Sequence, residues 1–312
     1  MRVILLERVF PIKIKSKMSI NELILEMKGS GAFGAGRLAR AVDIYEKMMN
    51  DKNCIKFFGL AGALVPGGMR QIIVDMLKEG YIDVFVTTGA SLTHDLIEAI
   101  NVHHLKGASE VDDVQLREDG LNRIFDIYLP NRAYEQLEDF IQPIFKSMIG
   151  KKLTISNFIQ EIGSKIKDPN SILRVLHDKK IPVYCPAIAD SGLGLQAWNF
   201  IQMNELDVQV FDDLKSLIDL AWDAKITGVC TVGGGVPKNH ILQALQFSSK
   251  THNYAIQITM DRPEPGGLSG ATLKEGISWG KIGKESEYVD VICDATIALP
   301  LLFGAVKERL QK

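Results

Sequence analysis

The stretch that decides the fold reads IKFFGLAGALVPGGMRQIIVDMLKEGYIDVFVTTGAS and covers residues 55–91. Ile55–Leu60 is a short, nearly continuous apolar run, which predicts a buried strand. A glycine-rich turn follows at Ala61–Gly68, and Met69–Lys78 has apolar residues at helical spacing. Ile82–Thr88 is a second strand-like run. This order of strand, turn, helix and strand predicts two parallel strands of an α/β sheet.

The same alternation continues along the chain. Short apolar runs predict four more strands, and segments near them have helical spacing. Because strands of this kind are apolar along their whole length, we expect a mostly parallel sheet with helices on both faces. The predicted strands are Ile181–Ala187, Ile226–Val232, Tyr254–Thr259 and Val289–Cys293, and the predicted helices are Asp95–Ile100, Leu214–Ala224, His240–Phe247 and Leu301–Leu310.

Two regions fit this alternation less well. The sequence of residues 1–50 indicates a basic, partly extended arm followed by a helix. The sequence of residues 101–180 indicates helices and long connections around the sheet. Lysines commonly protect solvated strand edges, although the arm could also bind a partner weakly. We therefore expect an arm and helix over 1–50, packed on a single α/β domain over 51–312. The basic residues of the arm are Arg2, Arg8, Lys13, Lys15 and Lys17.

The composition excludes several classes of protein. In 312 residues, 36 Lys and Arg nearly balance 38 Asp and Glu, for a net charge of −2. A nucleic-acid-binding domain is usually basic, so we expect no nucleic-acid partner. The chain is 46% hydrophobic and 24% charged, which is typical of a globular protein and not of a disordered one.

The four cysteines give no support to a metal or redox site. They stand at 54, 185, 230 and 293, with no Cys-x-x-Cys pair, and the set fits a reducing compartment. Cys230 and Cys293 lie in apolar runs and are expected in the core. The adjacent pair His103–His104 does not match a zinc motif, so no metal is expected. With no signal-peptide pattern and no uncharged run of about 20 residues, we expect a cytoplasmic protein that is not bound to a membrane.

Small and polar residues follow the predicted strands. In an open parallel sheet, ligands bind beyond the carboxyl ends of the strands, so these residues predict a nucleotide site. Each segment alone could equally be a turn or a helix cap. Neither G-x-G-x-x-G, nor a Walker motif, nor G-x-S-x-G is present, which disfavours standard dehydrogenases, kinases and serine hydrolases. The segments are 61–68, 87–91, 190–192, 233–235 and 294–296.

A long loop between two predicted strands contains the most reactive candidate. It runs from Gly266 through Glu275 to Trp279-Gly280-Lys281. A partly desolvated lysine has a lowered pKa and can attack a carbonyl as a free amine. Trp279 could provide the apolar surface and hold a cationic amine. Without further information, a Trp-Gly-Lys sequence in a loop is usually surface structure.

At this loop the chain resembles a known family. Gly-Ile-Ser-Trp-Gly-Lys-Ile at 276–282 is similar to the active-site stretch of deoxyhypusine synthase. Further similar segments occur in the family's order, and the resemblance covers about residues 30–308. They are 31–33, 40–42, 58–60, 83–88, 116–124 (LREDGLNRI), 181–183, 233–236 and 294–295.

The resemblance implies a Rossmann-like NAD-binding fold and a reaction. NAD oxidises spermidine, Lys281 holds the four-carbon fragment as an imine, and the fragment passes to a lysine of the hypusine-bearing translation factor. Trp279 and Glu275 match substrate-contacting positions. The family is tetrameric, with active sites between subunits. The implied cofactor contacts are Gly62, Ala63, Leu64, Val65, Pro66, Thr88, Gly89, Ala90, Asp190, Gly234, Asp294 and Ala295.

The sequence departs from the family's pattern at four positions. Asn239 replaces an amine-contacting histidine, although His240 follows, and Leu195 and Leu268 replace two aspartates of the polyamine site. His94 replaces a glutamate that contacts NAD. A leucine cannot replace the charged hydrogen bond of a carboxylate to an ammonium. Two alternatives therefore stay open: a homospermidine synthase-like enzyme with a free amine as acceptor, and a non-catalytic NAD-binding relative.

Overall fold

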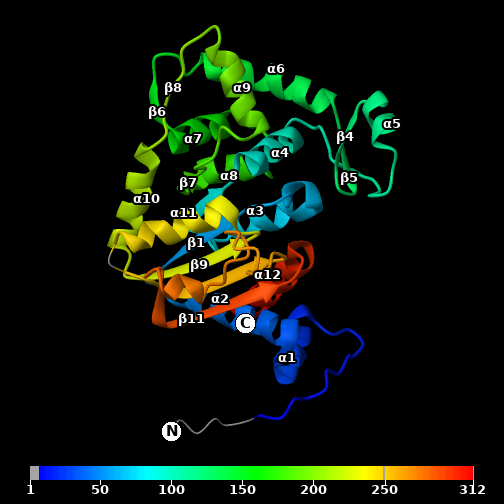
Figure 1. Cartoon of the computed structure of the whole chain (residues 1–312), viewed down its shortest axis with the longest axis vertical. Coiled ribbons are helices and arrows are strands. Elements are labelled where there is room, and N and C mark those ends of the chain that lie inside the picture. The colour runs from blue at the N-terminus through cyan, green and yellow to red at the C-terminus, as the bar shows by residue number, and fades with distance from the viewer. Residues whose placement is uncertain (1–6, 249, 312) are drawn as a thin grey trace.

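The computed structural model describes residues 7–248 and 250–311 and is built on one six-stranded sheet. Every pair of neighbouring strands in this sheet is parallel, as the alternation of strands and helices predicted. Figure 1 shows the sheet in the lower half of the molecule. In spatial order the strands are β11 (Ile282–Ile292), β10 (His252–Thr259), β9 (Ile226–Val232), β1 (Cys54–Leu60), β2 (Val84–Thr87) and β7 (Val183–Tyr184).

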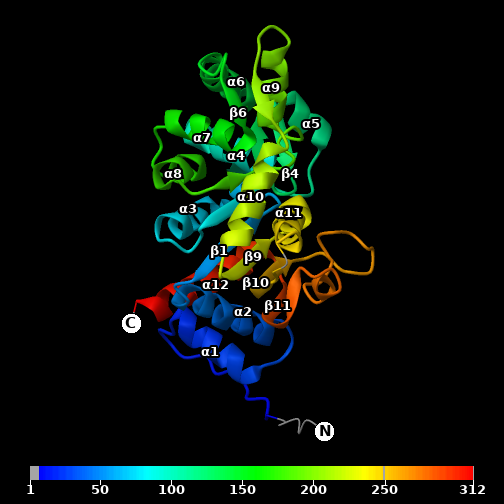
Figure 2. The same cartoon turned by 90° about the vertical axis from the view of Figure 1, so that its left-hand side faces the viewer.

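Helices cover both faces of this sheet, which confirms the predicted fold class. On one face, α2 (Phe33–Asn50) contacts β10 and β11, and α12 (Ala295–Leu310) packs against α2 and β10. On the other, α11 (Gly235–Gln246) contacts β1, β2 and β9, with α10 (Asp212–Asp223) beside it. Figure 2 shows α11 and α2 on opposite sides of the strands. Further helices are the π-helix η1 (Val65–Met69), α3 (Arg70–Lys78) and α4 (Gly89–Ala99), and α9 (Gly192–Ile201) packs on α4.

Alternation along the strands divides the apolar core between the two faces. Phe57 and Phe58 are neighbours in β1, yet they belong to different clusters of buried side chains. Phe58 stacks on Phe85 of β2, with ring centroids 6.2 Å apart. Successive side chains of a strand point to opposite faces, so a fully apolar strand supplies both cores.

The N-terminal region holds two helices where the sequence predicted one. α1 (Ile20–Ser30) begins with a capping box between Ser19 and Glu22 and ends at Gly31, whose φ of 63° suits glycine. The predicted strand edge is wrong: residues 7–15 form no strand, and Lys13 donates its backbone N–H to Glu26 of α1. Arg2 lies outside the described residues. The division into 1–50 and 51–312 stays a proposal.

Several element boundaries differ from the prediction for identifiable reasons. The strand predicted at Ile181–Ala187 is reduced to β7, because Pro182 and Pro186 on either side have no N–H to give to a ladder. β11 begins seven residues before the predicted Val289, at Ile282, and its charged start reflects its place at the edge of the sheet. α11 and α12 begin directly after their strands, earlier than predicted.

Residues 101–180 contain the expected helices and also short strands that the sequence did not indicate. These strands have two to four residues, too few for a visible alternation of apolar and polar side chains. Three pair antiparallel in the order β3-β5-β4, and β6 pairs with β8. The elements of this region are β3 (Leu105–Lys106), α5 (Asp113–Glu118), β4 (Leu121–Ile124), β5 (Ile127–Pro130), α6 (Arg132–Lys146), β6 (Lys152–Thr154), α7 (Ile155–Lys165) and α8 (Ile172–Lys179). β8 (Asp207–Gln209) comes later in the chain, after α9.

Among the described residues, no helix is both long and apolar enough to cross a membrane.

Candidate active site

A cavity of about 380 Å³ lies where four neighbouring strands end. It opens at the carboxyl ends of β1, β9, β10 and β11, the edge at which parallel sheets bind ligands. Its lining includes three of the five implied cofactor contacts that follow β1, and both of those that follow β11. The lining residues are Ala61, Gly62, Ala63, Leu64, Gly233, Ile258, Thr259, Met260, Asp261, Ser269, Cys293, Asp294, Ala295 and Thr296.

The glycines at this edge are required by close packing of the backbone. Gly233 and Gly234 have φ of 88° and 99°. A Cβ on Gly233 would lie 2.4 Å from the carbonyl oxygen of Ala61, and one on Gly234 would lie 2.9 Å from the Cα of Ser269. Gly234 thus brings the end of β9 against the loop that follows β10. The exposed N-termini of α11 and α12 beside it suit an anionic ligand group.

Asp294 is the N-cap of α12, the structural role that the sequence left open. Its Oδ1 accepts hydrogen bonds from the backbone N and the Oγ1 of Thr296, at 2.7 and 2.6 Å. The carboxylate stays exposed and lines the cavity, so capping does not prevent it from also binding a ligand hydroxyl. Cys293 is half-buried beside it, whereas Cys230 is fully buried in the core as predicted.

The expected contacts after β2 lie on the same edge of the sheet but do not line this cavity. Thr88 caps α4, and its Oγ1 accepts from the backbone N of Ser91. A Cβ on Gly89 would lie 2.4 Å from the Oγ of Ser191, so α4 and the start of α9 meet closely there. Ala90 is exposed at the open end of α4, and Asp190 is exposed just before α9. Val65 and Pro66 are buried in η1, beneath the glycine turn.

Lys281 stands at the end of the loop between β10 and β11. It is half-buried, and its Nζ donates to Oδ1 of Asn239 on α11 at 3.2 Å. The same Nζ lies 5.4 Å from the ring centroid of Trp279, within range of a cation–π contact. Burial lowers the pKa of Lys281. These contacts agree with the reading of Lys281 as a partly desolvated amine.

The other predicted amine-site residues divide into two groups. Leu268 lies in the loop before Lys281, and Glu275 is exposed in the 3₁₀ helix η2 (Glu275–Ile277). His240 is half-buried on α11, and burial lowers its pKa. Leu195, by contrast, lies on α9, which packs against α4 and α6. Figures 1 and 2 both place α9 at the far end of the molecule from β11.

Lys238 is a further residue of this region that the sequence analysis did not single out. It is 2% exposed, and its Nζ donates to the backbone oxygens of Leu268 and Ala271. Gln257 of β10 donates to the oxygen of Ala271 as well. The pKa of Lys238 is lowered to about 8, mainly by burial; the charges of Asp290 and Glu275 oppose this shift, and the charge of Lys281 adds to it. The side chains of Lys238 and Gln257 hold the loop that precedes Lys281 against the sheet. The sequence offered one indication of this role for Lys238: a lysine that stands three residues after a glycine triplet, in an otherwise apolar helix turn.

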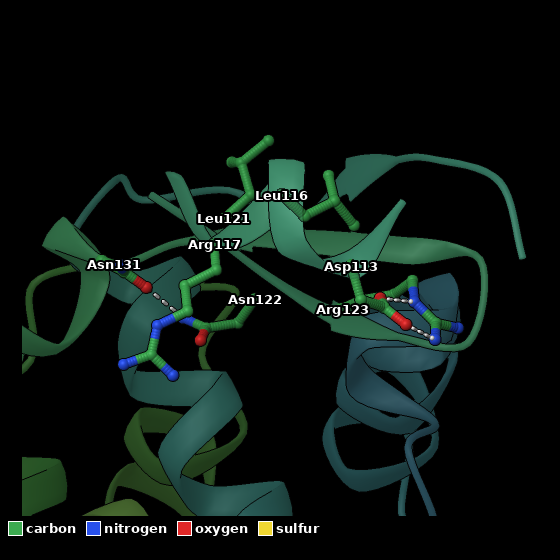
Figure 3. Close-up of a pocket in the computed structure, with 7 residues that line it drawn as sticks. All are labelled: Asp113, Leu116, Arg117, Leu121, Asn122, Arg123 and Asn131. Atoms are coloured by element: carbon green, nitrogen blue, oxygen red, sulfur yellow. Dashed lines mark hydrogen bonds and ion pairs between the residues drawn. The ribbon is translucent and has the colours of Figure 1, made fainter. Parts of the chain in front are cut away.

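The LREDGLNRI motif lines a separate pocket far from Lys281. Figure 3 shows this pocket of about 270 Å³, with Arg123 paired to Asp113 at 2.6 Å and Asn122 donating to Asn131 at 2.7 Å. Arg117 lines the same pocket and is exposed. These contacts tie β4 to α5 and to the start of α6. Within the described residues, no group of three His, Cys, Asp or Glu could hold a metal ion.

The fold and the site define an α/β protein with a glycine-lined cavity at the carboxyl edge of the sheet and a partly desolvated lysine at the end of the loop between β10 and β11. The deoxyhypusine synthase family model matches residues 22–306, and the chain belongs to this family.

Individual relatives agree. A protein of Methanosarcina acetivorans named "Probable deoxyhypusine synthase 1" is 49% identical over 300 residues, or 96% of this chain and 94% of that protein. One of Archaeoglobus fulgidus with the same name is 41% identical over 302 residues, or 97% and 98%. The solved structure of a candidate deoxyhypusine synthase from Entamoeba histolytica superimposes with a TM-score of 0.67 over 93% of each chain; at 18% identity this likeness concerns the fold.

Proposed function

We propose that this protein is an NAD-dependent aminobutyl transferase. In this proposal Lys281 displaces diaminopropane from oxidised spermidine and holds the four-carbon fragment as an imine. The fragment then passes to a lysine of the hypusine-bearing translation factor, where the hydride kept from the oxidation reduces the new imine. Membership of the deoxyhypusine synthase family supports an aminobutyl transferase role. The substrate, the cofactor and the imine are the parts that go beyond family membership.

The observation that carries the proposal is the environment of Lys281. A lysine attacks a carbonyl or imine carbon only as the free amine, so a lowered pKa raises the reactive fraction near neutral pH. Burial lowers the pKa of Lys281, while Asn239 offers a neutral acceptor that fixes the direction of Nζ without adding a negative charge. Trp279 lies over the same nitrogen and leaves an apolar surface for the methylene chain of an amine.

The residues at the sheet edge fit a dinucleotide. Gly233 lines the cavity after β9, where there is no room for a Cβ, and the N-terminus of α12 borders the cavity through Ala295 and Thr296. When bound, NAD would supply a hydride acceptor for the carbon that carries the amine. The glycine backbone and helix N-termini would hold its phosphates, and Asp294 could accept from a ribose hydroxyl. Thr88, Gly89, Ala90 and Asp190 would extend the same contact surface along the edge.

A trapping experiment tests this function. The protein is incubated with NAD and labelled spermidine, reduced with borohydride, and digested for peptide mapping. We expect a labelled adduct on Lys281, none in Lys281→Arg, and an unchanged adduct in Lys274→Arg, an exposed lysine of the same loop. NAD binding without an adduct from any amine would instead favour a non-catalytic, NAD-binding role.

A second acceptor class is favoured by specific residues. Leu268 and Leu195 offer no carboxylate to an ammonium, and Asn239 replaces a histidine with a neutral amide. A free diamine, as used by homospermidine synthases, is therefore the alternative acceptor. Adding either putrescine or the translation factor before the borohydride step distinguishes the two, because only the true acceptor takes the labelled fragment from the imine and leaves less label to be trapped on Lys281.

We also propose a homotetramer in the cytoplasm as the working form. Support comes from the separation, within one chain, of Leu195 on α9 from Leu268 and Lys281, which the family resemblance assigns to one amine site. Contact with a second copy would bring the two groups together. Analytical ultracentrifugation of the full chain checks this, and a monomer that forms the Lys281 adduct would contradict it.

A further inference from the structure

The start of α11 holds both ends of the loop between β10 and β11. Nζ of Lys238 donates to the backbone oxygen of Leu268 at 3.1 Å and to that of Ala271. The next residue, Asn239, accepts from Nζ of Lys281 at the other end of the loop. One short piece of helix therefore fixes the beginning of the loop and the reactive amine at its end relative to each other.

The turn at 268–271 is also a wall of the cavity. Ser269 stands between the two residues whose oxygens Lys238 binds, and it lines the cavity at the carboxyl edge of the sheet. A Cβ on Gly234 would lie 2.9 Å from the Cα of Ser269, so the turn rests directly on the end of β9. A ligand that fills the cavity would meet the same turn that Lys238 holds.

Two side chains of the sheet bind the same part of the loop. Gln257 of β10 donates to the backbone oxygens of Ser269 and Ala271, at 3.1 and 3.3 Å. Oδ1 of Asp290 on β11 accepts from the backbone N of Leu273 at 3.0 Å. The loop is thus bound from three elements, and α11 is the one whose side chains also bond the reactive amine.

The ammonium group of Lys238 is well suited to hold a turn in one geometry. Its side chain is 2% exposed, and a buried cation is strongly unfavourable unless charged hydrogen bonds compensate. Burial lowers its pKa, and the charges of Asp290 and Glu275 oppose this effect. An ammonium has three N–H donors, so one nitrogen can bind two carbonyl oxygens of the same turn. Such charged bonds are roughly twice as strong as neutral ones.

We infer that Lys238 is a positioning residue: it fixes the cavity wall at 268–271 and, together with Asn239, sets the distance between a ligand in the cavity and Nζ of Lys281. A bound ligand and a lysine react fast only when they are held in the reacting geometry, and a displacement of about 1 Å can cost about 100-fold in rate. The identity of the ligand and the chemistry of Lys281 rest on the proposed function, whereas the placement of the loop does not.

Hydrogen–deuterium exchange of the ligand-free protein tests the placement of the loop. Lys238→Met removes the donors, and we expect exchange over 266–281 to become about tenfold faster or more, because charged hydrogen bonds are lost. Lys238→Gln keeps neutral donors and should recover part of the protection. Lys250→Met is the matched control: Lys250 also donates to two backbone oxygens, those of Trp222 and Ala224 at the end of α10, and neither belongs to the loop.

The reactivity of Lys281 and ligand binding give the second test. In Lys238→Met, borohydride trapping of a small aldehyde on Lys281 should slow about tenfold at pH 8, and its pH profile should move to higher pH. The reason is that a loosened loop exposes the amine to water and a neighbouring positive charge is gone. Calorimetry should show NAD bound about two- to tenfold more weakly, since Ser269 lines the cavity. Lys250→Met should match the wild type in both.

Each result decides the role of Lys238. Loop exchange in Lys238→Met equal to that of the wild type overturns the inference. Faster exchange with an unchanged pH profile and unchanged NAD affinity also overturns it, because Lys238 would then serve stability alone. If urea unfolding shows that Lys238→Met does not fold, Lys238→Gln decides by the same readouts. If the wild type binds no NAD, the proposed cofactor fails, while loop exchange and aldehyde trapping still test the positioning of Lys281.

Discussion

Acidification should destabilise this protein through His252, a fully buried histidine at the start of β10. Neither ring nitrogen has a hydrogen-bond partner among the described residues, and the ring lies edge-on to Phe57 at 5.9 Å. Burial lowers the pKa of His252 from 6.5 to about 3. Between these two pKa values, His252 is protonated in the unfolded chain and neutral in the folded chain. The free energy of unfolding therefore decreases as the pH falls below about 6.5, and this decrease is complete near pH 3.

The magnitude follows from the two pKa values. At pH 5 the unfolded histidine gains about 2 kcal/mol from protonation, and the folded one gains almost nothing. Urea unfolding at pH 7.5 and pH 5, at one protein concentration, measures the difference. We expect His252→Leu to lose about 2 kcal/mol less than the wild type over this interval. Phe57→Leu loosens the same contact without removing a titratable group and should keep the wild-type pH dependence. Equal losses in wild type and His252→Leu would refute the reasoning.

Three further substitutions have defined outcomes. Arg70→Met leaves the fully buried carboxylate of Asp95 without its cation and should lower the free energy of unfolding by about 3–5 kcal/mol, measured in urea. Asn239→Asp adds a negative charge beside Nζ of Lys281, which raises the pKa of that lysine; borohydride trapping of a small aldehyde at pH 8 should slow about tenfold. Gly234→Ala forces a Cβ to 2.9 Å from Ser269 and should weaken NAD binding at least tenfold by calorimetry.

Each of these has a matched control. Arg123→Met breaks an ion pair whose Asp113 is exposed, and should change stability by less than about 1 kcal/mol; a loss as large as that of Arg70→Met would contradict the argument from burial. Asn239→Gln keeps a neutral amide, so we expect it to be trapped at the wild-type rate. Slow trapping in Asn239→Gln would mean that the shape of the side chain, and not its charge, slows the reaction in Asn239→Asp. Gly67→Ala meets Thr296 only at 3.4 Å, and NAD binding should survive it.

The sequence was most informative where a residue's environment depends on its immediate neighbours. β9 runs from Ile226 to Val232 as predicted, because every second side chain of a strand shares a face and this strand is buried on both. The glycine turns after β1 and β9 were visible for the same reason: a backbone that needs positive φ selects glycine locally. The predicted length of β7 was wrong because prolines on either side interrupt the strand pairing. The antiparallel strands around β5 were not predicted because they are too short to show an alternation of apolar and polar side chains.

Contacts between segments that are far apart in the sequence could not be predicted from the immediate neighbours of each residue. Lys281 and Asn239 are 42 residues apart and meet because the loop after β10 returns over α11. The loop takes this path partly because Lys238 and Gln257 bind its backbone oxygens from two different elements. Nothing in the local sequence of Leu268 or Ala271 indicates those partners, since a carbonyl group is the same in every residue.

The sequence by itself determined the parallel α/β sheet and the glycine-lined edge, because apolar periodicity and backbone conformation are local properties. It pointed to Lys281 through the resemblance of residues 276–282 to a known family, because residue chemistry alone also allowed a surface loop. Only the tertiary structure decided that Asn239 and Trp279 surround Lys281, that Leu195 lies on a distant helix, and that His94 hydrogen-bonds to His104. Burial lowers the pKa values of Lys281 and His94, and burial depends on which segments pack together.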